Sequence, residues 1–134
     1  MDCVFLAVNG SLMKGFDLNV NLIAVNARFV REAFTISEYR LWSIHGQYPA
    51  MQRYALKGSA IALEIWSLTP QALLTVLQQE PAGLVLGKII LEDNSMVLGI
   101  LGEAWICEGQ PEITAYGGWR NYLKNGKPYE PTVF

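Results

Sequence analysis

The sequence predicts an α+β domain in which a mixed or antiparallel sheet curls into a β-barrel with a few short helices on its flanks. Three observations predict this class: many short apolar runs of strand length, two or three helical segments placed irregularly among them, and no regular β–α–β alternation. With 134 residues, 51% of them hydrophobic, the chain can bury a substantial core. We assign residues 1–125 to a single domain and residues 126–134 to a C-terminal tail.

The first half of the chain contains three predicted strands and one predicted helix. An apolar run that ends at Asn9-Gly10 indicates a buried strand followed by a turn. Because Pro49 has no N–H group to give to a sheet, the segment His45–Pro49 is expected to form a loop or an edge. In order, the predicted segments are the strand Cys3–Val8, the helix Asp17–Val25, and the strands Arg28–Phe34 and Glu38–Ile44.

The second half contains the strongest strand pattern of the sequence and a well-marked helix start. Thr69 supplies an N-cap hydroxyl, and Pro70 occupies the first helical position. Asp93-Asn94 is a two-residue polar turn that fits a hairpin. The predicted segments are the strand Ala60–Leu68, a helix from Pro70 that ends before Pro81, the strands Lys88–Leu91 and Met96–Leu101, and a last helix at Trp119–Lys124.

Charge and composition exclude several classes of function. Ten basic and twelve acidic residues give a net charge of −2 without any basic stripe, so we expect no nucleic-acid binding. The apolar runs are too short to span a bilayer, and the acidic start Met1-Asp2 does not resemble a signal peptide, so we expect a cytoplasmic protein. Cys3, Cys107 and the single His45 lack metal-ligand spacing, so we expect no metal, and no nucleotide-binding motif suggests an organic cofactor.

Glu64 is a charged residue in the middle of the Ala60–Leu68 strand. Its face also carries small residues and Trp66, so Glu64 is either exposed to solvent or lines a cavity of the curled sheet. The simpler interpretation is a solvent-facing charge that pairs with Arg53 or Lys88.

Three further residues have more than one plausible role. Arg120 is a candidate to hold a carboxylate with two hydrogen bonds, or to cap the carbonyl at a helix end. Trp119 is expected in the core, as is Trp66. His45 lies in a glycine-containing loop and is expected at the surface.

Four short segments carry recognisable motifs. Val8–Leu12 joins a strand to a Gly-Ser turn, Gly46–Ala50 contains a Tyr-Pro pair, Gly58–Trp66 ends in Leu-Glu-Ile-Trp, and Leu77–Glu80 closes a helix with a glutamate. In this order they resemble the γ-glutamylcyclotransferase-like family, in which the first segment binds substrate and the last carries the acid/base glutamate. The resemblance implies the γ-glutamylcyclotransferase-like fold.

A second set of segments resembles the C-terminal domain of allophanate hydrolases over roughly residues 5–123. The chain departs from that domain at Leu12, where the domain tends to carry a histidine that takes part in decarboxylating the amidase product. By contrast, Glu80 restores a carboxylate that the domain often lacks. We also expect the chain to stand alone, without an amidase fused to it. The segments are Gly15 with Leu18-Asn19, Ala27–Arg31, Tyr39–Leu41, Pro81 with Gly87, and Ile113–Tyr122.

The turn after the first strand is the candidate substrate-binding element. A glycine-centred turn can aim successive backbone N–H groups at a carboxylate or an oxyanion, although Gly10 alone could simply permit a tight turn. The resemblance implies the binding role. The substrate-binding residues that we infer are Asn9, Gly10, Ser11 and Leu12, together with the phenols of Tyr48 and Tyr116.

Glu80 is the candidate catalytic residue. In the cyclotransferase reaction that the resemblance implies, this carboxylate takes a proton from the substrate's α-amino group, whose nitrogen then attacks the γ-amide carbon and forms 5-oxoproline. Burial near the helix end would raise the pKa of Glu80 towards a working acid/base value. The alternative is an ordinary solvated glutamate.

We therefore predict a small-molecule enzyme-like domain that binds a compact carboxylate-bearing amide, either a γ-glutamyl compound or one related to urea and allophanate metabolism. The alternative is a catalytically silent binding or oligomerisation module associated with an amidase. The high apolar fraction leaves room for a partner surface, either in a homodimer or on that amidase.

Overall fold

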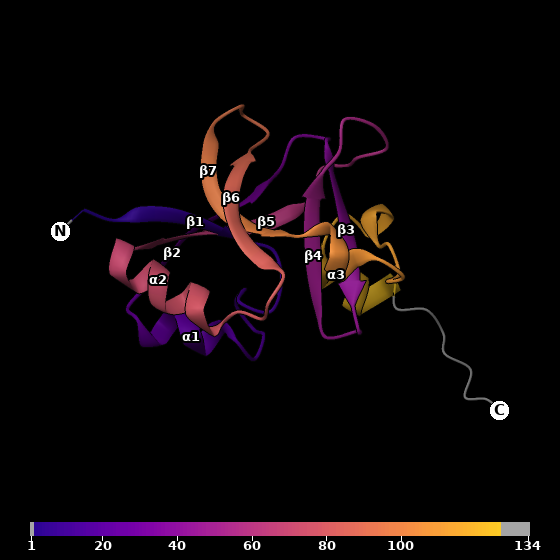
Figure 1. The fold of residues 1–134 in the computed structure, drawn as a ribbon. Helices are drawn as coiled ribbons and strands as arrows, with labels where there is room; N and C mark the ends of the chain where they lie inside the picture. Colours follow the sequence, from indigo (N-terminus) through magenta and orange to yellow (C-terminus); the bar gives the residue numbers. More distant parts are fainter. Residues whose placement is uncertain (1, 127–134) are drawn as a thin grey trace.

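The computed structural model describes residues 2–126, which form a curled mixed sheet, a separate two-stranded hairpin and several short helices (Figure 1). The sheet has the strand order β2-β5-β1-β7-β6. Adjacent strands in the sheet run antiparallel, except β1 and β7, which run parallel. The strands are β1 (Val4–Val8), β2 (Arg28–Phe34), β5 (Ala62–Leu68), β6 (Leu84–Ile90) and β7 (Met96–Gly102). The α+β class is confirmed.

The sheet curls but does not close, so the term barrel describes it only loosely. Its two edge strands approach each other at one point, where Thr35, after β2, forms a single antiparallel bridge with Leu91, after β6. The Glu92 N–H donates to the Phe34 carbonyl across the same junction at 3.0 Å. A single bridge is not a ladder, and the alternation of apolar residues in separate strands does not determine whether two sheet edges pair.

The hairpin of β3 (Tyr39–Ile44) and β4 (Tyr48–Arg53) stands at the end of the sheet opposite the N-terminus (Figure 1). The sequence analysis expected a loop or an edge at His45–Pro49 and did not predict β4; of these two alternatives, the structure has the edge. Pro49 pairs with Ser43 inside the hairpin. In a two-stranded hairpin each strand has an unpaired side, so a residue without an N–H group is tolerated there.

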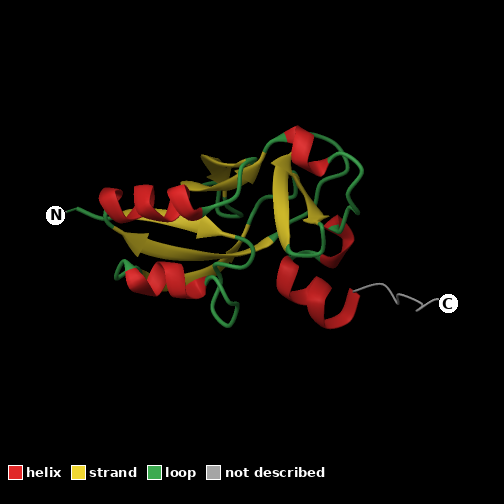
Figure 2. Ribbon diagram, turned by 60° about the horizontal axis from the view of Figure 1, so that its bottom comes forward, coloured by secondary structure: helices red, strands yellow, loops and turns green. Residues whose placement is uncertain are grey.

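Two helices lie beside the sheet near the N-terminal end, and the short C-terminal helices lie beside the β3–β4 hairpin (Figures 1 and 2). As predicted, Thr69 caps α2: its side chain accepts the N–H of Ala72 at 3.1 Å, with Pro70 as the first helical residue. Within residues 2–126, no helix is both long and apolar enough to cross a membrane. The helices are α1 (Asn19–Ala24), α2 (Pro70–Gln79), α3 (Ala104–Cys107), the 3₁₀ turn η1 (Thr114–Tyr116), α4 (Trp119–Asn121) and the π turn η2 (Tyr122–Gly126).

The predicted Asp93-Asn94 hairpin is also present, between β6 and β7, with a side-chain oxygen of Asp93 accepting the N–H of Ser95 at 2.9 Å.

The core is built from residues of both sheet faces. Trp66 and Trp119 are buried in it, as expected from the sequence.

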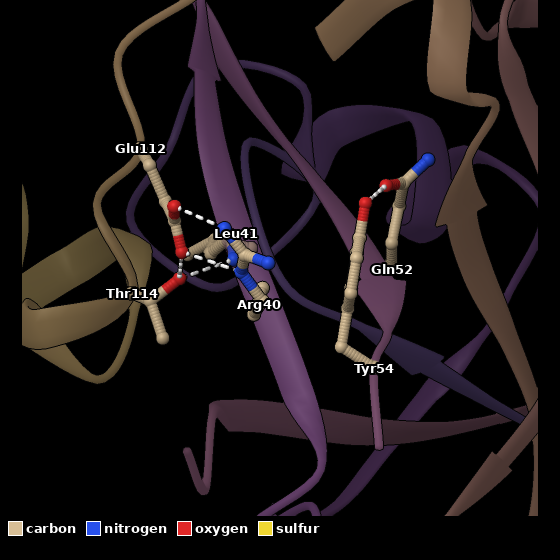
Figure 3. Close-up of polar contacts among 6 residues, drawn as sticks. All are labelled: Arg40, Leu41, Gln52, Tyr54, Glu112 and Thr114. Carbon is tan, nitrogen blue, oxygen red and sulfur yellow. Dashed lines mark hydrogen bonds and ion pairs between the residues drawn. The ribbon is translucent and has the colours of Figure 1, made fainter. Parts of the chain in front are cut away.

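A polar network ties the segment before the C-terminal helices to β3 (Figure 3). The Arg40 guanidinium donates to both carboxylate oxygens of Glu112, at 2.8 and 2.6 Å. The hydrogen bond from Arg40 lowers the pKa of Glu112 to about 2. The Thr114 hydroxyl accepts the Leu41 N–H at 2.9 Å and donates to Glu112. This network fixes where the chain enters the residues Tyr116–Asn125, which line a cavity described below.

Candidate functional site

The turn after β1 is held rigidly by groups from distant strands. Asn9 is only 4% exposed, and its side-chain amide donates to the Ile100 carbonyl of β7 at 3.0 Å. Gly10 lies against the ring of Pro49, where a Cβ atom would collide with the ring carbons. The Met13 N–H then closes the turn on the Gly10 carbonyl at 2.9 Å. Gly10 therefore lets the β3–β4 hairpin pack directly on the turn.

Glu80 is placed at the end of α2 by the residue that follows it. The residue before a proline avoids the helical conformation, and Glu80, which precedes Pro81, is extended with φ −80° and ψ 150°. The helix therefore ends at Gln79, and the Glu80 side chain lies half-buried beside the turn. Burial raises the pKa of Glu80 from 4.5 to about 7.

The Glu80 carboxyl, the turn and Tyr48 line one small cavity, which we call the Glu80 cavity. Its volume is about 20 Å³, roughly the room that a single water needs. Burial raises the pKa of the Tyr48 phenol, and the negative charge of Glu80 raises it further. The lining residues are Val8, Asn9, Gly10, Ser11, Leu12, Tyr48, Pro49, Glu80, Leu84 and Ile100.

Six of the seven residues inferred from the sequence thus lie around one cavity, and one of them, Leu12, is a core residue that is 3% exposed. The seventh, Tyr116, lies elsewhere, in the wall of a larger cavity. His45 is exposed in the β3–β4 turn, where its N–H donates to the Gln110 side chain at 2.9 Å. Sequence reasoning did not select Leu84 and Ile100, since apolar strand residues give no signal of a site.

Of the two alternatives for Glu64, the solvent-facing charge paired with Arg53 or Lys88 is wrong, and Glu64 instead lines a cavity, the larger one that Tyr116 also lines. Its side chain is 3% exposed and pairs with Arg120 at 3.0 Å, whereas Arg53 pairs with Glu38. One Glu64 oxygen also accepts the Trp66 indole N–H at 3.1 Å and the Lys14 backbone N–H at 2.9 Å. The prediction failed because the partner lies 56 residues away in the sequence.

The Glu64–Arg120 pair holds both backbone groups of Lys14. Glu64 accepts the Lys14 N–H, and Nη2 of Arg120 donates to the Lys14 carbonyl at 3.0 Å. Neither role considered for Arg120 is found in that form: Arg120 donates one hydrogen bond to the Glu64 carboxylate, not two, and the carbonyl that it contacts belongs to Lys14 in a turn, not to a helix end. Because Lys14 follows the turn of the Glu80 cavity by two residues, the pair fixes the far end of that turn.

Solved structures with the same fold include a γ-glutamyl cyclotransferase, at 13% sequence identity and a TM-score of 0.57 over 99% of this chain and 91% of that one. The protein therefore has the γ-glutamylcyclotransferase-like fold. It belongs, more narrowly, to the allophanate hydrolase C-terminal domain family, whose sequence profile matches residues 4–124.

The relatives differ in how much of their length this chain accounts for. A uropathogenic E. coli-specific protein is 47% identical, with a TM-score of 0.91 over 93% of this chain and 98% of that one. The allophanate hydrolase of Kluyveromyces lactis is 27% identical, with a TM-score of 0.86 over 92% of this chain but 21% of its own. The urea amidolyase of Lachancea kluyveri is 29% identical over 98% of this chain, which spans only 8% of that protein. In the latter two, the homologous region is one part of a much longer chain.

Proposed function

We propose that the chain binds a compact carboxylate-bearing amide at the Asn9–Leu12 turn and that Glu80 acts on it as a general acid and base. One observation carries the proposal: the Glu80 carboxyl and the turn line the same cavity. With a pKa of about 7, the carboxyl is present in both protonation states near neutral pH, which suits a group that takes up and returns a proton.

The roles of the individual groups follow from their chemistry. In a cyclotransferase-type step, the Glu80 carboxylate removes a proton from the amino nitrogen of the substrate, and this nitrogen forms a bond to the amide carbon. The C–N bond of the amide then breaks, and the Glu80 carboxylic acid returns the proton to the nitrogen that leaves. Backbone N–H groups of the turn hold the substrate carboxylate. The Tyr48 phenol, whose raised pKa keeps it protonated, is a hydrogen-bond donor to the same substrate.

The size of the cavity favours a small substrate. At about 20 Å³ it admits only a small group beside Leu12, unless side chains move on binding. Neither allophanate nor a γ-glutamyl dipeptide fits a cavity of this size as it stands, but allophanate is the smaller of the two and requires the smaller movement of the lining side chains. The names of the relatives, allophanate hydrolase and urea amidolyase, support the same substrate class.

A second candidate function is a catalytically silent module that associates with an amidase. Its support is the buried Leu12, an apolar residue in the cavity wall, and the place of the homologous region as a small part of longer enzymes. In this case the Glu80 cavity would be a remnant, and a separate amidase chain would be the partner.

A thermal-shift screen distinguishes these two functions. The wild type, Glu80→Gln and Leu12→Ala are each tested against malonate, biuret, allophanate, 5-oxoproline and a γ-glutamyl dipeptide. Ligand at a hundredfold excess over its dissociation constant stabilises the native state by about 2.7 kcal/mol, which is readily seen as a rise in melting temperature. A shift that Glu80→Gln abolishes supports the enzyme-like function. If no compound shifts any variant, including Leu12→Ala with its enlarged cavity, the acid/base proposal is wrong and the silent module is favoured.

A further inference from the structure

A second cavity lies on the other side of the turn, and the proposed function leaves it without a role. Its volume is about 500 Å³, inside the range of roughly 300–1,000 Å³ that is typical of small-molecule sites. Strands β2 and β5 form one wall, and residues Tyr116–Asn125 form the other. The segment Ile113–Tyr122, which carries part of the family resemblance, therefore contributes Tyr116 through Arg120 to this cavity. We call it the Arg120 cavity.

The walls of the Arg120 cavity are largely apolar. Met13 and Leu63 are buried core residues that reach its surface, and the Phe34 side chain is 43% exposed there. An apolar ligand that covered Phe34 would remove this surface from water, which is favourable in proportion to the area covered.

Arg120 is a preorganised cation in this wall. Its Nη2 is fixed by Glu64 and the Lys14 carbonyl, and its guanidinium carbon lies 4.8 Å from the centre of the Phe16 ring. Within residues 2–126, neither Nε nor Nη1 donates a hydrogen bond, and the side chain is 44% exposed. These atoms retain donors for an anion, and no side-chain ordering is needed on binding.

Two other charged residues determine how a ligand is oriented. Lys124, on η2, lines the same cavity and makes no ion pair within the described part of the chain. Glu32 lies in the β2 wall, directly opposite Glu64 in the strand register. The charge of Glu64 is balanced by that of Arg120, so among the described residues Glu32 is the acidic group of this wall without an ion pair, and it repels an anion. An anionic group is therefore favoured on the Arg120–Lys124 side.

We propose that the Arg120 cavity is a second binding site, which takes a compact organic acid whose apolar body lies against Phe34, Met13 and Leu63 and whose carboxylate faces Arg120 and Lys124. This site is separate from the Glu80 cavity, and the proposal does not depend on an acid/base role of Glu80.

The test is isothermal titration of the full chain with three acids, namely indole-3-acetate, 4-phenylbutyrate and hexanoate, each compared with its uncharged amide. We expect at least one acid to bind at millimolar or lower concentration, and its amide to bind at least about tenfold more weakly, because the amide lacks the charge-assisted hydrogen bond. Lys124→Gln should weaken binding by roughly two- to fivefold, and Glu32→Gln should strengthen it by a similar factor.

Two variants locate the binding. Lys88→Gln removes an exposed lysine on β6, outside this cavity, and is the matched control for Lys124→Gln; it should leave the affinity unchanged. Glu80→Gln should also leave it unchanged. The proposal is overturned if none of the three acids binds, if acid and amide bind equally, or if Glu80→Gln abolishes binding that Lys124→Gln leaves intact.

Discussion

Replacing Glu64 tests whether a buried carboxylate organises the turn of the candidate site. In Glu64→Ala, the buried Trp66 indole N–H loses its acceptor, at a cost of about 1–3 kcal/mol, and the partly buried Lys14 N–H loses its acceptor at a cost of about 1 kcal/mol. Arg120 adds at most about 1 kcal/mol, because its 44% exposed side chain can turn to solvent. We therefore expect a loss of about 4 kcal/mol in the free energy of unfolding, a large part of the roughly 5–15 kcal/mol typical of a domain.

Urea denaturation followed by tryptophan fluorescence measures this loss. Glu64→Gln retains an oxygen for Lys14 and Trp66, so it should lose only about 1–2 kcal/mol. Glu38→Ala is the control: it breaks an ion pair whose two side chains are 42% and 51% exposed, and should cost less than about 1 kcal/mol. Amide hydrogen exchange should also show a faster-exchanging Lys14 N–H in Glu64→Ala. If Glu64→Ala costs no more than Glu38→Ala, Glu64 does not organise this turn.

Two other predictions concern residues of the Glu80 cavity. Gly10→Ala places a methyl group where the Pro49 ring lies, so it should lower the free energy of unfolding by about 1–3 kcal/mol. Adding Pro49→Ala to this variant should restore part of the loss. If the effects of the two substitutions are simply additive, the two residues are not in contact. The pKa of Glu80 is raised by folding, so its contribution to stability is full below pH 4.5 and is lost as the pH rises through about 7. The free energy of unfolding of Glu80→Gln should therefore equal that of the wild type at pH 4 and exceed it at pH 8, by about 2 kcal/mol after allowance for partial exposure. Melting curves recorded across this range measure the difference. An equal difference at both pH values would contradict the raised pKa.

The fold was largely predictable because local rules and tertiary structure agree in most segments. The bounds predicted for β2 are those observed, and Thr69-Pro70 starts α2 as its capping chemistry requires. The strand β4 was not predicted, because Pro49 suggested a loop or an edge. In the hairpin, the N–H group that Pro49 lacks is not needed, because β4 is an edge strand with an unpaired side. Nothing in the strand pattern indicated whether the curled sheet would close.

For the candidate site, the sequence predicted residues that belong to a motif but did not predict pairs of residues that are distant along the chain. Glu80 and the turn were identified through the resemblance, and the structure brings them together around one cavity. For Glu64, the sequence left open whether the residue is exposed or lines a cavity, because burial and pairing with Arg120 depend on how distant segments meet. Tyr116 has the right chemistry for a carboxylate, but the Arg40–Glu112 network ties the segment before it to β3 (Figure 3), and Tyr116 lines a different cavity from Glu80.

The central claim is that the half-buried Glu80 carboxyl is an acid/base group beside the turn. Its pKa can be measured directly from the carboxyl carbon chemical shift in a pH titration by NMR, with Glu80→Gln used to assign the signal. We predict a midpoint of about 7, well above the value of 4.5 for a solvated glutamate. A midpoint near 4.5 would show that Glu80 is solvated in the native protein, and would contradict its proposed role as acid and base.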